Sequence, residues 1–353
     1  MQEICLLRLS AIGDTTHVLP VIATIQKRYP QARITWIIGT LEHKLIQGLE
    51  GVEFIVFNKS GGFKEMGRLR RLLKSRRFDV LLHMQLSFRA NLIGMMVRAG
   101  RKIGFDKNRS KELHSLAINE RVPFKDRIHV LDGFMQFAEA IDAGEPVYKW
   151  PVTLSDEDHA FAQSHVLQQP AVIISHSSSH ALRNWLPDRY AAVADYLVEK
   201  FNAQVFLCGG PAPREKRLGA EIASLCQQSV IDLTGQDTLK QLMAMMQAVD
   251  LVISPDSGPL HMAGAAGTPV IGLHGGSNYR RSGSYQFPQL VVDVYPQACE
   301  EIYGKPIDAL KWGIKAEQQG VMEKIQTADV CRSIDRWYND FFSKANSVDG
   351  RQS

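Results

Sequence analysis

Short apolar runs alternate with longer helical stretches along the 353 residues, and this alternation constrains the fold more than any other feature. In the first half, the strand-like runs lie at 3–9, 33–39, 53–57, 79–84 and 101–105. In the second half, they lie at 171–176, 203–210, 229–233, 250–255, 268–275 and 290–294. Such alternation is typical of parallel α/β sheets. We therefore expect an α/β chain with two doubly wound, Rossmann-like domains that face each other across a cleft.

The segment at 144–155 separates the two series. It contains one glycine and two prolines and has no periodic apolar face, as expected of a linker. We predict a first domain at 1–150 and a second at 151–326. We expect the C-terminal helix, within 327–353, to pack back onto the first domain.

Composition excludes several classes of protein. With 45% apolar and 22% charged residues, the chain has an ordinary globular balance, and a net charge of +4 does not predict nucleic-acid binding. Five cysteines without a CxxC pair indicate buried thiols in a reducing compartment rather than a metal site. The N-terminus does not resemble a signal peptide, and no apolar run reaches the roughly 18 residues of a membrane span. We expect a cytoplasmic protein.

The loop "RLSAIGDTTH" at 8–17 follows the first predicted strand. Ligands of open parallel sheets bind beyond the carboxyl ends of the strands, so such loops are the first places to look for chemistry. Asp14 could be the N-cap of the next helix, or a general base that takes a proton from a substrate hydroxyl at the floor of the cleft. A single glycine does not make a dinucleotide fingerprint.

Three loops of the second half, at 176–190, 208–216 and 254–261, have the residues expected of a diphosphate site. Hydroxyls and one guanidinium in the first could hold phosphate oxygens, and two glycines in the second permit close approach. In the third, Gly258 and Pro259 start a helix whose free N–H groups could cradle a diphosphate, while Asp256 orients His261 or accepts a sugar hydroxyl. The alternatives are a solvated serine loop and a capped helix with a buried histidine. The candidate donor-binding residues are Ser177, Ser178, Arg183, Gly209, Gly210, Asp256, Ser257, Gly258 and His261.

"SPDSGPLHMAGAAGTPVIGLHG" at 254–275 resembles the nucleotide-sugar motif of the family 9 glycosyltransferases, the lipopolysaccharide heptosyltransferases. "LLRLSAIGD" resembles their N-terminal motif, with Asp14 at the position of the base. The segments at 84–92, 101–114, 129–141 and 303–325 resemble the heptosyltransferase I (OpsX-type) branch. This family usually has a lysine two residues before a tryptophan in the loop at 176–190, where this chain has Arg183 before Trp185.

The resemblance implies a GT-B fold, ADP-L-glycero-D-manno-heptose as donor and Kdo–lipid A as acceptor. It implies an inverting single displacement in which Asp14 activates a Kdo hydroxyl, with no cofactor, and without a DxD pair the chain does not call for a metal. An anionic acceptor fits a second group of polar and basic residues in the first half, namely Ser10, Gly13, Arg89, Arg101, Lys107 and Arg109.

The predicted helix at 64–78 has Met66, Leu69, Leu72 and Leu73 on one face and basic residues on the others. It is either a solvated face or a surface that touches the inner leaflet of the cytoplasmic membrane.

Three alternatives remain open at this point. A transferase that adds a later core heptose would share these motifs. A nucleotide-dependent oxidoreductase or epimerase would need a glycine-rich fingerprint that is not clear here. A non-catalytic nucleotide-sugar-binding protein would keep the second-half site and dispense with Asp14.

Overall fold

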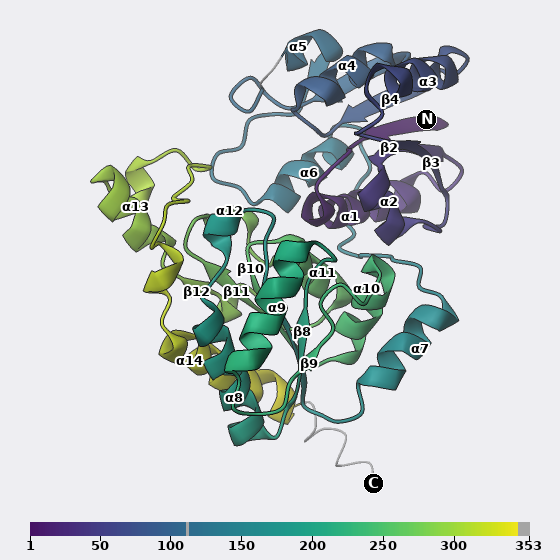
Figure 1. Cartoon of the computed structure of the whole chain (residues 1–353). Coiled ribbons are helices and arrows are strands. Elements are labelled where there is room, and N and C mark those ends of the chain that lie inside the picture. The colour runs from purple at the N-terminus through teal and green to yellow at the C-terminus, as the bar shows by residue number, and fades with distance from the viewer. Residues whose placement is uncertain (111–112, 345–353) are drawn as a thin grey trace. The chain divides into compact units, whose positions relative to one another are not determined.

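The computed structural model describes residues 1–110 and 113–344, which form two compact units that meet in sequence between Thr153 and Leu154 (Figure 1). This boundary lies inside the predicted linker at 144–155. Each unit contains one six-stranded parallel sheet, as the alternation of strands and helices predicts. The α/β class with two doubly wound sheets is therefore confirmed.

The first sheet has the strand order β3-β2-β1-β4-β5-β6. Its strands are β1 (Glu3–Leu7), β2 (Arg33–Gly39), β3 (Val52–Phe57), β4 (Phe78–His83), β5 (Ala99–Gly104) and β6 (Glu120–Arg121). The helices between and after them are α1 (Ile12–Arg28), α2 (Thr40–Ile46), α3 (Gly62–Lys74), α4 (Phe88–Met96), α5 (His114–Ala117) and α6 (Val130–Glu139). β1 is paired on both sides, by β2 and β4, and its residues Ile4–Leu7 are fully buried. A near-continuous apolar run is what a central strand of a sheet covered on both faces requires.

The second sheet has the order β12-β11-β10-β7-β8-β9, which repeats the topology of the first. Its strands are β7 (Ala171–Ser175), β8 (Gln204–Cys208), β9 (Ile231–Asp232), β10 (Leu251–Pro255), β11 (Val270–His274) and β12 (Val292–Asp293). Its helices are α7 (Asp156–His165), α8 (Pro187–Phe201), α9 (Pro213–Leu225), α10 (Leu239–Ala248), α11 (Gly258–Ala266), α12 (Tyr279–Ser282), α13 (Tyr295–Tyr303) and α14 (Thr327–Trp337).

In both sheets the strand order reverses next to the first strand of the unit. The chain leaves β1 towards β2 and later returns to β4 on the other side of β1, and β7 has the same relation to β8 and β10. The loops after β1 and β4, and after β7 and β10, therefore diverge at a topological switch point, where doubly wound sheets bind ligands. Asp14 follows β1, and Asp256 follows β10.

We expected the C-terminal helix to pack on the first domain, but helix α14 packs on the core of the second unit. Val330, Ile334 and Trp337 share one face at helical spacing and belong to the core of the second unit. The indole N–H of Trp337 donates to the carbonyl of Asp250, just before β10, at 3.0 Å. The apolar stripe predicts that the helix is covered, but it does not identify the covering surface. Residues 345–353 of the predicted segment lie outside the described residues.

Helix α3 buries a narrower stripe than predicted. Leu69 and Leu73 are buried and Met66 packs beside them, whereas Leu72 is 41% exposed at the edge of the stripe. Phe63, in the first turn, is 97% exposed. Among the residues that the structure describes, no helix has the length and apolar content needed to cross a membrane.

Candidate functional site

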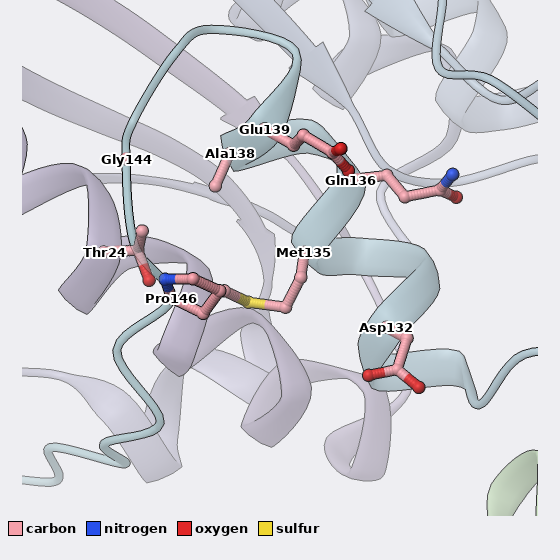
Figure 2. A pocket seen from close by; sticks show the side chains of 8 residues that line it. All are labelled: Thr24, Asp132, Met135, Gln136, Ala138, Glu139, Gly144 and Pro146. Carbon is pink, nitrogen blue, oxygen red and sulfur yellow. The ribbon is translucent and has the colours of Figure 1, made fainter.

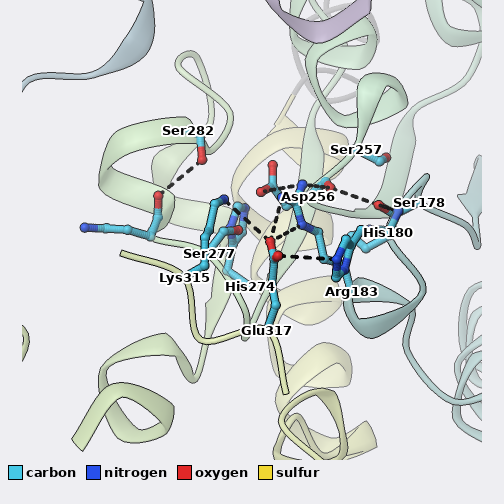
Figure 3. A network of polar contacts seen from close by, with 12 residues as sticks. Ser178, His180, Arg183, Asp256, Ser257, His274, Ser277, Ser282, Lys315 and Glu317 are labelled. Atoms are coloured by element: carbon cyan, nitrogen blue, oxygen red, sulfur yellow. Dashed lines mark hydrogen bonds and ion pairs between the residues drawn. The ribbon is translucent and has the colours of Figure 1, made fainter. Parts of the chain in front are cut away.

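The loops after β7 and β10 meet at the switch point of the second sheet, where Arg183 joins them (Figure 3). Arg183 lies in a short 3-10 helix, Ala181–Arg183, that follows the serine loop. Its Nη1 lies 3.3 Å from both the carbonyl oxygen and the Oδ2 of Asp256. The hydroxyl of Ser178 donates to the same carbonyl at 3.5 Å. The structure thus brings together three of the predicted donor-binding residues.

Asp256 is a buried carboxylate that stays ionised. Burial alone would raise its pKa, but nearby positive charge, including that of Arg183, and a hydrogen bond from Ser277 lower the pKa below its usual range. His274, at the end of β11, is buried beside it, and desolvation lowers the pKa of this imidazole to about 4. His261 Nε2 lies 4.0 Å from Asp256 Oδ1, as expected if the carboxylate orients the imidazole. Asp256 therefore faces the Arg183 guanidinium, the His261 imidazole and a neutral His274.

Helix α11 begins at the edge of this cluster. Ser257 is its N-cap and Gly258 its first residue, with Pro259 in the first turn. The hydroxyl of Ser257 pairs with that of Ser254 at 2.9 Å instead of capping the helix. The first-turn N–H groups of a helix, together with its dipole, favour an anion. Helix α11 therefore begins where the sequence predicts, and the diphosphate cradle at its start stays a prediction.

Glu215, in the first turn of α9, contacts two more of the predicted donor residues, and the sequence analysis missed it. Its Oε2 accepts from the Ser177 hydroxyl at 2.5 Å and from the Gly210 N–H at 2.7 Å. Gly209 packs closely on its neighbours, since a Cβ there would lie 3.0 Å from Cε1 of the buried His176. Glu215 thus ties the loop after β7 to the loop after β8.

Two more residues that the sequence analysis missed, Lys315 and Glu317, lie in an irregular segment after α13. Glu317 Oε1 accepts from Arg183 Nε at 2.8 Å and lies 3.7 Å from the Lys315 ammonium. Desolvation lowers the pKa of Lys315. The segment at 303–325 resembles the OpsX-type branch, but no periodic pattern within it indicates that Lys315 and Glu317 reach the cluster.

In the first unit, Asp14 is the third residue of α1 rather than its N-cap, which is Ala11. Its Oδ2 accepts from the Ala11 N–H at 3.4 Å and forms an ion pair with Arg8. Arg8 also donates to the carbonyl of Met84, after β4, at 2.5 Å, and its guanidinium lies 5.1 Å from the ring centroid of Phe134. Arg8 therefore fixes the carboxylate at the switch point of the first sheet. Gly13 is buried in the same turn.

A hollow of about 440 Å³ opens beside this loop. It contains two predicted residues, Ser10 and Arg89, and Gln85 joins its walls by accepting from the Leu9 N–H at 2.6 Å and donating to the Ser10 hydroxyl at 3.2 Å. Lys59, which the sequence analysis missed, lines the hollow and pairs with the buried Glu42 at 2.9 Å.

A second hollow of about 300 Å³, between α1, α6 and the chain at 144–146, contains none of the predicted site residues (Figure 2).

The other predicted acceptor residues do not line the hollow that contains Ser10 and Arg89. Arg101 lies near the amino end of β5 and forms an ion pair with Glu120 of β6 at 2.6 Å, so it links two strands of the sheet. Arg109 pairs with Asp106, and its Nη2 donates to Gln136 at 2.9 Å. Lys107 is exposed beyond the carboxyl end of β5. Strand-end reasoning therefore fits Lys107 and Arg109 but not Arg101.

The described residues contain no group of three or more His, Cys, Asp or Glu side chains that could hold a metal ion.

Comparisons with known proteins find relatives of this chain over most of its length. The model of glycosyltransferase family 9 (heptosyltransferase) matches residues 66–309. The lipopolysaccharide core heptosyltransferase OpsX of Haemophilus influenzae is 39% identical over 330 residues, which cover 93% of this chain and 95% of the relative. A family 9 glycosyltransferase structure from Veillonella parvula has a TM-score of 0.78 at 20% identity, over 95% of this chain and 97% of that one. The structure of the E. coli heptosyltransferase WaaC with ADP has a TM-score of 0.69 at 17% identity, over 95% of this chain and 100% of that one.

Asp237, between β9 and α10, gives a pH-dependent prediction. Its Oδ2 has no hydrogen-bond partner in the described part of the chain, and burial raises its pKa to about 7. An unfolded aspartate has a pKa of about 3.9, so between these values the folded state holds a proton that the unfolded chain has lost. The contribution of Asp237 to stability therefore falls as pH rises through this range.

We expect Asp237→Asn to raise the free energy of unfolding by about 1–2 kcal/mol at pH 8 and to leave it unchanged at pH 4. Urea unfolding at the two pH values measures the difference. Asp156→Asn, which changes an exposed aspartate of the same unit, serves as control. An equal gain for Asp237→Asn at both pH values would contradict the assignment.

Proposed function

Because the chain belongs to glycosyltransferase family 9, we propose that it transfers L-glycero-D-manno-heptose from ADP-heptose to Kdo of lipid A in lipopolysaccharide core synthesis. The transfer inverts the anomeric centre. The observation that carries this proposal is the cluster of Arg183, Asp256 and the start of α11 at the switch point of the second sheet. A cation beside a helix N-terminus suits the diphosphate of a nucleotide sugar. The relative OpsX, similar over nearly the whole chain, is a core heptosyltransferase.

Each unit supplies one half of the chemistry. In the first, Asp14 accepts the proton of a Kdo hydroxyl, whose oxygen attacks the anomeric carbon of the donor from the face opposite ADP. The new carbon–oxygen bond forms as the bond to the β-phosphate oxygen breaks, and ADP leaves with the electron pair. In the second, Arg183, His261 and the N–H groups near Ser257 and Gly258 stabilise the charge that develops on ADP. The remaining donor contacts are assigned to Ser177, Ser178, Gly209 and Gly210.

We expect Asp14→Asn to lower acceptor-dependent release of ADP from ADP-heptose by about 10²–10⁴-fold, because the amide cannot take the proton. ADP binding should persist, because the donor contacts lie in the second unit. Release of ADP with and without Kdo–lipid A, together with calorimetric titration of ADP, measures both quantities.

Asp126→Asn, which changes an exposed aspartate of the first unit, is the matched control. Full turnover by Asp14→Asn would exclude this residue as the base. Binding of ADP-heptose without turnover in the wild type would instead favour the non-catalytic nucleotide-sugar-binding protein.

The hollow with Ser10, Lys59 and Arg89 is our proposed acceptor site. Kdo has a carboxylate, and Arg89 lies exposed at the start of α4 and lines the same hollow as Ser10. A guanidinium binds a carboxylate through two parallel hydrogen bonds. We retain Gly13, Lys107 and Arg109 as accessory acceptor residues, and we leave out Arg101 because its partner is Glu120.

Arg89→Ala should raise the KM for Kdo–lipid A about tenfold with little change in the KM for ADP-heptose, since it removes a charge-assisted contact to the acceptor alone. Steady-state kinetics with each substrate varied in turn tests this. Arg33→Ala removes an exposed arginine at the amino end of β2 and should change neither constant. An unchanged acceptor KM in Arg89→Ala would remove Arg89 from the site.

Helix α3 is our proposed contact with the inner face of the cytoplasmic membrane. Its Lys64, Arg70, Arg71 and Lys74 are exposed, as is Phe63 in its first turn. Basic residues at an anionic lipid surface contribute about 1 kcal/mol each, and an exposed aromatic ring adds apolar contact. The contact would keep the enzyme close to a lipid-linked acceptor.

We expect the protein to co-sediment with phosphatidylglycerol vesicles, and much less with phosphatidylcholine vesicles or at high salt. The variant Arg70→Glu/Arg71→Glu should lose this binding, whereas Lys27→Glu/Arg28→Glu, with the same charge change at the end of α1, should retain it. Equal vesicle binding by all three proteins would exclude α3 as the contact.

A transferase that adds a later heptose differs in acceptor alone. Turnover with an acceptor that already has one heptose, and none with Kdo–lipid A, would decide for that alternative.

A further inference from the structure

Glu317 lies among the positive groups of the donor site (Figure 3). Its Oε1 contacts Arg183 twice, at 2.8 Å from Nε and 2.6 Å from Nη2, and the Lys315 ammonium lies 3.7 Å away. Its Oε2 lies 3.6 Å from Nε2 of His180. The third nitrogen of Arg183, Nη1, contacts Asp256. Every nitrogen of the guanidinium thus contacts an acidic residue of the protein.

The formal charges of this cluster balance. Arg183 and Lys315 contribute two positive charges, and Asp256 and Glu317 contribute two negative charges. A nucleoside diphosphate brings at least two more negative charges. Like charges held close together in a partly buried site repel strongly, so one carboxylate must move or the affinity for the diphosphate must fall.

Of the two carboxylates, Glu317 is better placed to move. Asp256 is the more buried of the two, and the Arg183 charge and a hydrogen bond from Ser277 stabilise its ionised form. Glu317 lies on an irregular segment, and its longer side chain has more rotatable bonds. The backbone beside it is fixed, since the Ala316 N–H donates to the Gly276 carbonyl at 3.0 Å. A Cβ at Gly276 would lie 2.9 Å from Glu317 Cγ, so the glycine is needed for this approach.

We propose that Glu317 sets the affinity of the donor site by competing with the nucleotide's diphosphate for Arg183 and Lys315. When a nucleoside diphosphate binds, its phosphate oxygens take the positions around these cations, and the Glu317 carboxylate swings aside. When the product leaves, Glu317 returns and restores the balance of charge. The inference rests on the proposed function, because it takes the same cluster as the diphosphate site.

The test is calorimetric titration of ADP into the wild type and the variants Glu317→Gln and Glu317→Ala. Removal of the competing charge should lower the Kd for ADP about five- to tenfold in both variants, the scale of one partly screened charge pair. The Kd for adenosine, which has no phosphate, should not change. Glu323→Gln removes the same charge from an exposed glutamate of the same unit and should leave both constants unchanged.

The sign of the change separates competition from a positioning role. If Glu317 instead held Arg183 in place for the ligand, Glu317→Ala would weaken ADP binding, and that result would overturn the proposal. Unchanged ADP affinity in Glu317→Gln, which is isosteric and folds most readily, would overturn it equally. Failure of the wild type to bind ADP would contradict the proposed function itself and this inference with it.

Discussion

The reversal of strand order beside β1 and beside β7 is the constraint on which the candidate site of each unit depends. At these points two loops leave adjacent parallel strands in opposite directions, so their backbone groups and side chains can surround a ligand. The first sheet places Asp14 and Arg8 there, and the second places Arg183, Asp256 and the start of α11. The same topology, used twice, presents a carboxylate paired with Arg8 in one unit and a cluster of paired cations and carboxylates in the other.

The periodic features of the structure could be predicted from the sequence, whereas the pairings between distant segments could not. The strand-like runs predict the two sheets, and the Gly-Pro start of α11 predicts its N-terminus. An apolar stripe says that α14 is buried but not by what, and a basic residue near a strand does not reveal its partner, as Arg101 and Glu120 demonstrate. Lys315 and Glu317 reach the site from an irregular segment, where no local pattern encodes position.

Charge compensation links the stability of the second unit to its chemistry. A buried carboxylate such as Asp256 costs free energy unless cations or hydrogen-bond donors compensate for its desolvation. Arg183 and Ser277 supply this compensation, and Glu317 then balances the guanidinium. Each group suits binding of an anion only because the others are present. A substitution at one of these positions therefore changes the contribution of the others, and the effects of several substitutions on binding should not add.

The packing of α14 limits how this chain can be divided. Trp337 is buried in the core of the second unit, and its indole N–H is hydrogen-bonded to Asp250, the residue before β10. The helix therefore completes this unit, although it begins more than 30 residues after the last strand. A fragment designed to end with the sheet would leave a large apolar surface in water and aggregate. Any separately produced second unit must therefore extend beyond Trp337.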